Sequence, residues 1–180
     1  MNTIQAIKTR KSPEAFNTKV IPTSDLKTIV EAGNYAPIFG KVQFTVVTDA
    51  ELLNTINEVA LHMMKNSGNE FLEKTANIPG YHAVRHAAAF VILSAPGGNE
   101  PMGFNMANVS CAAENIQLAA TELGIGSRFM MGPIMALTQE PVKSRLDLPE
   151  DYQPLVAVAL GYVDDEFSER TKEMNNIKYI

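Results

Sequence analysis

The stretch Met106-Ala-Asn-Val-Ser-Cys-Ala-Ala-Glu-Asn-Ile-Gln-Leu-Ala-Ala-Thr-Glu-Leu123, followed by Gly124-Ile-Gly126, decides how the rest of the chain is interpreted. Apolar side chains recur along it at helical spacing, at Val109, Ala113, Ile116, Ala120 and Leu123. This spacing predicts a helix over residues 106–123, and Gly124 is a typical residue to end it. Alanines 107, 112 and 119 extend the apolar surface round much of the cylinder. Such a helix is normally buried in a core or an interface, so we expect it at the centre of the fold.

Shorter helices and strands are predicted on both sides of this helix. Apolar spacing and capping residues indicate four shorter helices. The first covers residues 3–9, with Ile4 and Ile7 pointing inward. The others cover residues 24–35, a segment that begins at a Thr48–Glu51 capping box, and residues 141–146. Runs rich in β-branched and apolar residues predict strands over 44–47, 88–94, 127–131 and 155–160. The polar segment 65–81 is expected to be a loop. This mixture favours an α+β or α/β class with three or four strands.

Composition limits the classes of protein that fit. The chain has 180 residues, 46% of them apolar and 19% charged, which suits one globular domain spanning residues 1–180. A formal net charge of −5 argues against general nucleic-acid binding, which relies on many Lys and Arg side chains. One Cys excludes an internal disulfide framework. Trp is absent altogether.

No targeting or membrane segment is evident in the sequence. Residues 1–11 lack the uninterrupted apolar run of a signal peptide. The longest strongly apolar run, residues 87–93, is far shorter than the roughly 20 residues that span a bilayer. We therefore expect a soluble, cytoplasmic protein with no membrane partner.

Several residues that often carry chemistry are better explained without it here. His82 and His86 are four residues apart, but no Glu lies between them as in a zinc protease motif, so we expect surface histidines and no metal site. Cys111 lies within the apolar helix and is expected to be a buried structural thiol. Gly124-Ile-Gly126 follows a helix rather than a strand, which indicates a cap and turn rather than a dinucleotide-binding loop.

Two basic groups are stronger candidates for a binding site. Arg10-Lys11-Ser12 places two cations beside a hydroxyl, a combination suited to a phosphate or an anionic ring edge. Arg170 and Lys172 form a second group near the C-terminus. Either group alone is also what a solvated surface looks like.

A family resemblance connects these groups. Residues 115–127, Asn-Ile-Gln-Leu-Ala-Ala-Thr-Glu-Leu-Gly-Ile-Gly-Ser, resemble the central helix motif of the nitroreductase family, the FMN-dependent NAD(P)H oxidoreductases. Three further blocks are similar to that family in the right order, at residues 6–16, at 31–37 with 44–53, and at 148–150 with 156–162.

This resemblance implies a fold, a cofactor and a site. The fold would be the α+β FMN-binding sandwich, with helices around a largely antiparallel sheet, built as an intertwined homodimer with two FMN sites at the interface. Arg10, Lys11 and Ser12 would hold the phosphate, ribityl chain and pyrimidine edge of FMN, and Arg170 and Lys172 would approach the phosphate. The backbone of Met130, Met131 and Gly132 would meet the flavin. NAD(P)H would be the reductant, and a small molecule the electron acceptor. Flavin chemistry needs no separate catalytic acid, base or nucleophile from the protein.

The chain departs from the family pattern at the flavin-side loop and in the opening motif. Residues 36–44 read Ala-Pro-Ile-Phe-Gly-Lys-Val-Gln-Phe, without the Ser, the Asn and the Pro-Trp segment that the family usually has. Pro37, Phe39, Lys41 and Gln43 are the cofactor-side candidates in this loop, with Lys41 as a donor to flavin or substrate. Phe39 is either a stacking residue or a packing residue beside Pro37. Glu14 stands where the family has a third cation.

Three functions are consistent with these observations. The first is an FMN-dependent oxidoreductase with ping-pong hydride transfer to a nitroaromatic, a quinone or a similar acceptor. The second is a catalytically altered flavin-binding module with the same fold. The third is a dimeric binding protein for another anionic ligand, which leaves the central helix motif unexplained.

Overall fold

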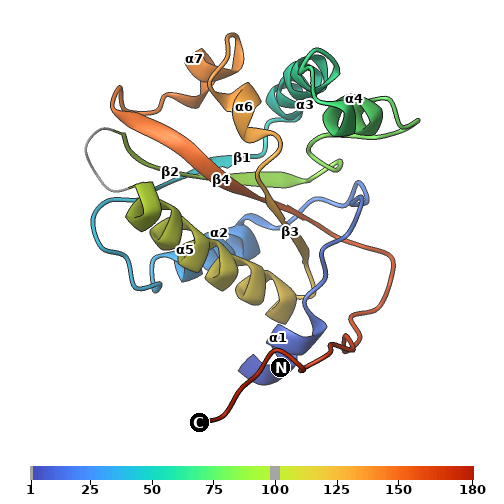
Figure 1. The fold of residues 1–180 in the computed structure, drawn as a ribbon, viewed down its shortest axis with the longest axis vertical. Helices are drawn as coiled ribbons and strands as arrows, with labels where there is room; N and C mark the ends of the chain where they lie inside the picture. The colour runs from blue at the N-terminus through green and yellow to red at the C-terminus, as the bar shows by residue number, and fades with distance from the viewer. Residues whose placement is uncertain (1, 98–101) are drawn as a thin grey trace.

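The computed structural model describes residues 2–97 and 102–180, and within them the chain forms seven helices and four strands (Figure 1). The α+β class expected from the sequence is confirmed. In chain order the elements are α1 (Thr3–Thr9), α2 (Thr23–Gly33), β1 (Gln43–Val47), α3 (Ala50–Lys65), α4 (Glu70–Ala76), β2 (Ala89–Pro96), α5 (Met102–Glu122), β3 (Gly126–Met130), α6 (Ile134–Leu137), α7 (Val142–Leu146) and β4 (Tyr152–Gly161).

The four strands form one antiparallel sheet in the order β1-β2-β4-β3. Val91 of β2 lies opposite Val46 on one side and Val158 of β4 on the other. Val158 in turn lies opposite Phe129 of β3. The two central strands are almost continuously buried, which explains why their sequences are unbroken apolar runs rather than alternating ones.

Helices cover both faces of the sheet, as Figure 1 shows. Side chains alternate between the faces of a strand, so neighbouring residues enter different cores. Phe90 and Ile92 of β2 pack in the core beneath α3, α6 and α7, whereas Val91 and Leu93 pack in the core with α2 and α5. The expected sandwich of helices around an antiparallel sheet is therefore confirmed.

Helix α5 packs through the face that the sequence predicts. Val109, Ala113, Ile116 and Ala120 are fully buried, while Leu123, beyond the helix, is 39% exposed. α2 approaches α5 closely at Gly33, where a Cβ would lie 3.2 Å from Ile116 Cδ1. The helix ends as predicted, with Gly124 at φ +70°, a conformation that glycine adopts without strain.

The other face of α5 stays open to solvent. It carries Phe104, which is 58% exposed, together with Ala107 and Cys111. The prediction that Cys111 is a buried thiol is therefore wrong, because this residue lies on the side of α5 that points away from the sheet.

Helix α1 is also oriented differently from the prediction. Ala6 and Thr9 are its buried residues, while Ile4 and Ile7 are 62% and 43% exposed. In seven residues, two isoleucines three positions apart define a stripe without showing whether the helix turns that stripe toward its own core.

The starts of α2 and α3 differ from the prediction by about one residue, whereas α5 starts four residues earlier than predicted, at Met102. Asp49, rather than Thr48, caps α3, since its side chain accepts a hydrogen bond of 2.7 Å from the Leu52 backbone N–H. α2 starts at Thr23 after Pro22, and the side chain of Ser24 does not cap it.

Helix α4 lies inside the segment that was expected to be a loop. Asn69 caps it by accepting hydrogen bonds from the backbone N–H groups of Phe71 and Leu72. Its seven residues are too few for a clear apolar period, and Gly68 and Pro79-Gly80 favoured a loop. Among the residues that the structure describes, no helix is long and apolar enough to cross a membrane.

Candidate functional site

The first basic group lies directly after α1 and is partly buried. Arg10 Nη1 donates to Ser12 Oγ at 3.2 Å, and Arg10 Nε lies 3.3 Å from Glu114 Oε1 on α5. Lys11 Nζ lies 3.6 Å from Asp165 Oδ2 in the C-terminal segment. The side chains of Arg10 and Lys11 are only 20% and 22% exposed. Both cations are therefore held in place at the protein surface rather than extended into water.

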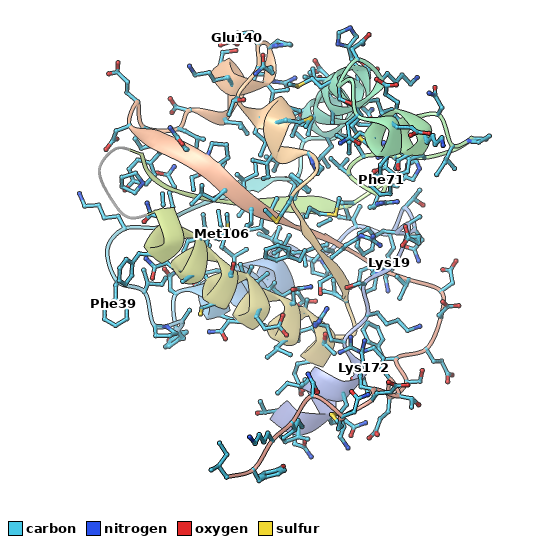
Figure 2. All side chains as sticks on the ribbon, in the orientation of Figure 1. Lys19, Phe39, Phe71, Met106, Glu140 and Lys172 are labelled. Carbon is cyan, nitrogen blue, oxygen red and sulfur yellow. The ribbon has the colours of Figure 1, made fainter. Side chains whose placement is uncertain are left out.

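The C-terminal segment brings the second basic group to the same place. Arg170 Nη2 donates to the Ile7 carbonyl at 2.8 Å, and its Nε donates to the Lys8 carbonyl at 3.3 Å. These carbonyls belong to the last turn of α1 and have no partner within the helix, so Arg170 caps that end. Lys172 lies beside α1 (Figure 2). The structure thus joins the two groups that the sequence could only suggest separately.

Two further arginines, missed by sequence reasoning, meet the same segment at Glu14. Arg128 Nη1 donates to Glu14 Oε1 at 2.8 Å, and Arg85 Nη1 donates to Glu14 Oε2 at 3.0 Å. The hydrogen bond from Arg128 is the main cause that lowers the pKa of the Glu14 carboxyl, and the charges of both arginines add to it. The sequence offers one signal for Arg128, namely its position directly after the central helix motif of residues 115–127.

The cluster has more donors than acceptors. In the residues that the structure describes, the Nε atoms of Arg10 and Arg85 are buried and make no hydrogen bond. Glu114 is within ion-pair distance of Arg10 Nε but not in hydrogen-bond geometry. A buried donor left without an acceptor costs about 1–3 kcal/mol. These nitrogens are shielded from solvent, so an anionic ligand such as a phosphate would meet the partly exposed ends of Arg10 and Lys11 instead.

Ion pairs gather at this end of a chain that is acidic as a whole. The chain has a formal net charge of −5. In this region five cations pair with four carboxylates, and a sixth cation, Arg170, caps α1. The cations are Lys8, Arg10, Lys11, Arg85, Arg128 and Arg170, and the carboxylates are Glu14, Glu114, Asp165 and Glu169.

Strand β3 leads from this cluster to the next predicted site residues. Met130 ends the strand and is buried, whereas Met131 is 57% exposed and Gly132 is exposed as well. At about 3.3 Å per residue, Arg128 and Gly132 are separated by roughly 13 Å along the chain. Met131 and Gly132 therefore lie just beyond the end of the strand that carries Arg128.

The loop over residues 36–44 is held at the N-terminal half of α5. The Phe39 backbone N–H donates to Asn108 Oδ1 at 3.0 Å, and Asn108 Nδ2 donates to the Phe39 carbonyl at 2.6 Å. The side chain of Phe39 is 76% exposed, which does not fit the alternative of a packing residue beside Pro37. Pro37 and Lys41 are exposed too, and Gln43 is half-buried.

Within one chain, this loop and the cationic cluster are not brought together. Phe39 contacts α5 at Asn108, whereas Arg10 contacts α5 at Glu114, nearly two turns further on. Figure 2 shows Phe39 and Lys172 at different ends of the α5 layer.

The two histidines form a pair of their own. Their ring centroids lie 4.0 Å apart, and His82 Nδ1 accepts a hydrogen bond from the His86 backbone N–H. Burial, followed by the charges of His86 and Arg85, lowers the pKa of His82 to about 4. His86 is exposed, as expected, but His82 is half-buried. The described residues contain no group of three or more side chains able to hold a metal ion.

An antiparallel sheet between two helical layers, with a cluster of cations at one end, defines this chain as an α+β protein. The chain belongs to the nitroreductase family, whose model matches residues 7–162. The family expected from the central helix motif is therefore confirmed.

Individual relatives agree with this assignment. A protein of Archaeoglobus fulgidus that carries the provisional name NADH dehydrogenase/NAD(P)H nitroreductase is 28% identical over 169 residues, which cover 91% of this chain and 86% of that protein. A nitroreductase from Bacteroides fragilis NCTC 9343, solved with bound FMN, has a TM-score of 0.86 and 30% identity, covering 100% of this chain and 99% of the other. A nitroreductase from Desulfitobacterium hafniense DCB-2, also solved with FMN, has a TM-score of 0.86 at 23% identity with the same coverage, and shows the shared fold.

Proposed function

We propose that this protein is an FMN-dependent NAD(P)H oxidoreductase, with residues 1–180 forming a single domain. The observation that carries the proposal is the convergence of Arg10, Lys11, Ser12 and Arg170 at the end of α1, in a chain that belongs to the nitroreductase family. When bound, FMN supplies the chemistry, accepting a hydride from NAD(P)H and passing reducing equivalents to an acceptor. The protein supplies binding, orientation and charge.

Each group of residues has a distinct part in this proposal. Arg10, Lys11 and Ser12 hold the phosphate, the ribityl chain and the pyrimidine edge, with Arg170 and Lys172 adding positive charge near the phosphate. The exposed backbone of Met131-Gly132 and the neighbouring Met130 lie along the ring. Backbone N–H groups there would orient the ring by donating hydrogen bonds to it.

The proposed enzyme is a homodimer. The open face of α5 carries Phe104, Ala107 and Cys111, an apolar surface on a helix whose opposite face is buried. The 36–44 loop and the cationic cluster lie apart along α5 in one chain, so a second copy packed on this face would bring one copy's loop to the other's cluster. Pro37, Phe39, Lys41 and Gln43 would then complete the partner's site.

We further propose ping-pong hydride transfer to a nitroaromatic, a quinone or a similar small acceptor. The site proposed along Met131-Gly132 is exposed in the single chain, which suits two small planar substrates that bind there in turn. Lys41, exposed in the loop, is placed to attract an anionic group of either substrate.

A catalytically altered flavin-binding module is the second candidate. It is favoured by Ile38 and Lys41, which replace the polar residues that the family resemblance expects in the loop. Both candidates bind FMN and differ in turnover.

The test is the visible spectrum of the purified protein with and without added FMN, followed by NAD(P)H oxidation with menadione or a nitroarene. The oxidoreductase proposal expects a flavin spectrum and rapid oxidation that requires the acceptor. A protein that takes up FMN but does not turn over supports the second candidate. A protein that stays colourless and binds no FMN overturns both.

A further inference from the structure

Position 14 carries Glu where the family resemblance expects a cation, but the guanidinium of Arg128 reaches this position from strand β3. Arg128 of β3 donates through Nη1 to Glu14 Oε1 at 2.8 Å. The same nitrogen lies 2.9 Å from the Pro13 carbonyl oxygen and 3.3 Å from the Ser12 carbonyl oxygen. One guanidinium therefore holds the 12–14 segment against the edge strand of the sheet.

Ser12 connects this contact to the candidate cofactor residues. Its hydroxyl accepts a hydrogen bond from Arg10 Nη1, while its carbonyl accepts one from Arg128. Arg128 thus fixes the backbone of the residue whose side chain Arg10 contacts. Moving Arg128 would release Ser12 and, through it, change the setting of Arg10.

Arg85 holds Glu14 from the other side. Its Nη1 donates to Glu14 Oε2 at 3.0 Å, and its guanidinium lies 4.6 Å from the ring centre of Tyr81. Its carbonyl accepts a hydrogen bond of 2.9 Å from the Phe16 N–H, which anchors the far end of the same segment. Both carboxylate oxygens of Glu14 are therefore engaged, each by a different arginine.

Glu14, Arg85 and Arg128 form a triad whose net charge equals that of the cation expected at position 14. Two guanidinium groups and one carboxylate carry a net charge of one positive, which is what a single Lys or Arg at position 14 would contribute. The hydrogen bond from Arg128 lowers the pKa of the Glu14 carboxyl, so Glu14 stays ionised and the balance persists at neutral pH.

We propose that Arg128 replaces the cation missing from position 14, and that Glu14 holds Arg128 and Arg85 in place around the cofactor-binding segment. Arg128 and Glu14 are positioning residues in this arrangement, since they act through Ser12 and Arg10. The inference rests on the proposed function, namely that this segment holds FMN.

The deciding experiment exchanges the charges. Arg128→Met leaves Glu14 paired with Arg85 alone, which removes the net positive charge of the triad and the hydrogen bonds to the 12–14 backbone, and we expect FMN affinity to fall about 30-fold. Glu14→Lys alone crowds three cations and lowers affinity about tenfold. The double variant, Glu14→Lys with Arg128→Met, returns a cation to position 14 but not the hydrogen bonds from Arg128 to the 12–14 backbone, so affinity should recover in part, to within about tenfold of the unaltered protein. Affinity is measured by quenching of flavin fluorescence.

Two controls separate positioning from general destabilisation. Arg145→Met removes another arginine that pairs with two carboxylates, on α7, and should leave FMN affinity unchanged. Glu14→Gln keeps a side chain able to accept a hydrogen bond but raises the charge of the triad by one, so the midpoint potential of bound FMN should rise. A purely structural role for Glu14 would not move that potential, and this variant keeps the test open if Arg128→Met fails to fold.

Two results would overturn the inference while the proposed function stands. One is a double variant that binds FMN no better than Arg128→Met. The other is an unchanged midpoint potential in Glu14→Gln. If the unaltered protein binds no FMN at all, the proposed function fails first, and the inference fails with it.

Discussion

Arg170 Nη2 lies 2.8 Å from the carbonyl oxygen of Ile7, a contact between residues 163 positions apart in the chain. The Arg170 backbone N–H also donates to the Lys8 carbonyl at 3.1 Å. The C-terminal segment is therefore fixed to α1 at the point where the chain enters Arg10-Lys11-Ser12. This contact joins the two basic groups into one cluster. The geometry of the cluster therefore depends on the position of the C-terminal segment.

The first prediction tests that connection. Arg170→Ala removes a cation and the cap on the last carbonyls of α1, so FMN affinity should fall about tenfold, and the free energy of unfolding by about 1 kcal/mol. Affinity is followed by flavin fluorescence, and stability by chemical denaturation. Lys178→Ala, a charge removed from the exposed end of the same segment, is the control and should change neither. Equal FMN affinity in Arg170→Ala and the unaltered protein would contradict the role of Arg170.

The sequence predicted the elements whose patterns are long or strongly apolar. α5, with 21 residues, presents the predicted stripe, and the runs that became β2 and β4 are buried from end to end or nearly so. The apolar pattern of α5 could not show that one of its faces is exposed. Small apolar residues such as Ala107 and Cys111 fit a face that packs on the sheet and a face that packs on a second copy equally well. For the same reason Ile4 and Ile7 were assigned to the wrong side of α1.

The candidate site was only partly within reach of sequence reasoning. Arg10-Lys11-Ser12 could be identified from a local pattern of residue types. Glu14 was recognised as a departure, but its meaning depends on Arg85 and Arg128, which lie 71 and 114 positions away in the chain. Contacts over such separations follow from sheet topology, and a single sequence does not encode that topology in any local window.

The second prediction concerns the open face of α5. Ala107→Arg adds a large cation to an exposed position, so the chain should stay folded while a dimer formed through this face dissociates. Light scattering coupled to size exclusion measures the mass, and circular dichroism checks the fold.

The matched control is Ala113→Asp on the opposite face. Ala113 is fully buried against the sheet, so this change should unfold the protein rather than produce a folded monomer. The folded monomer expected from Ala107→Arg should also bind FMN much more weakly, because part of each proposed site comes from the partner copy. A folded Ala107→Arg dimer with full FMN content would argue against α5 as the interface.

The third prediction tests how the flavin-side loop is held. Asn108 is buried and makes two hydrogen bonds with the Phe39 backbone. Asn108→Ala should cost about 1–3 kcal/mol of stability, because the Phe39 backbone groups lose their partners. NAD(P)H oxidation should show a raised KM with a smaller change in kcat, since the loop binds rather than reacts. Phe39→Ala, which leaves the backbone contacts intact, should not lower stability, and an equal loss in both variants would count against this anchor.

The fourth prediction follows from the pKa of His82, which burial and the neighbouring His86 and Arg85 lower to about 4. In the unfolded chain a histidine titrates near 6.5, so between pH 6.5 and 4 the unfolded state binds more protons than the folded state. Stability should therefore be complete at pH 7 and decline as the pH falls through this window. His82→Gln removes the titration and should flatten the decline in melting temperature between pH 7 and 4.5. His62→Gln, an exposed histidine at the end of α3, is the matched control and should keep the slope of the unaltered protein. A His82→Gln profile as steep as that of the unaltered protein would assign the acid sensitivity to other groups.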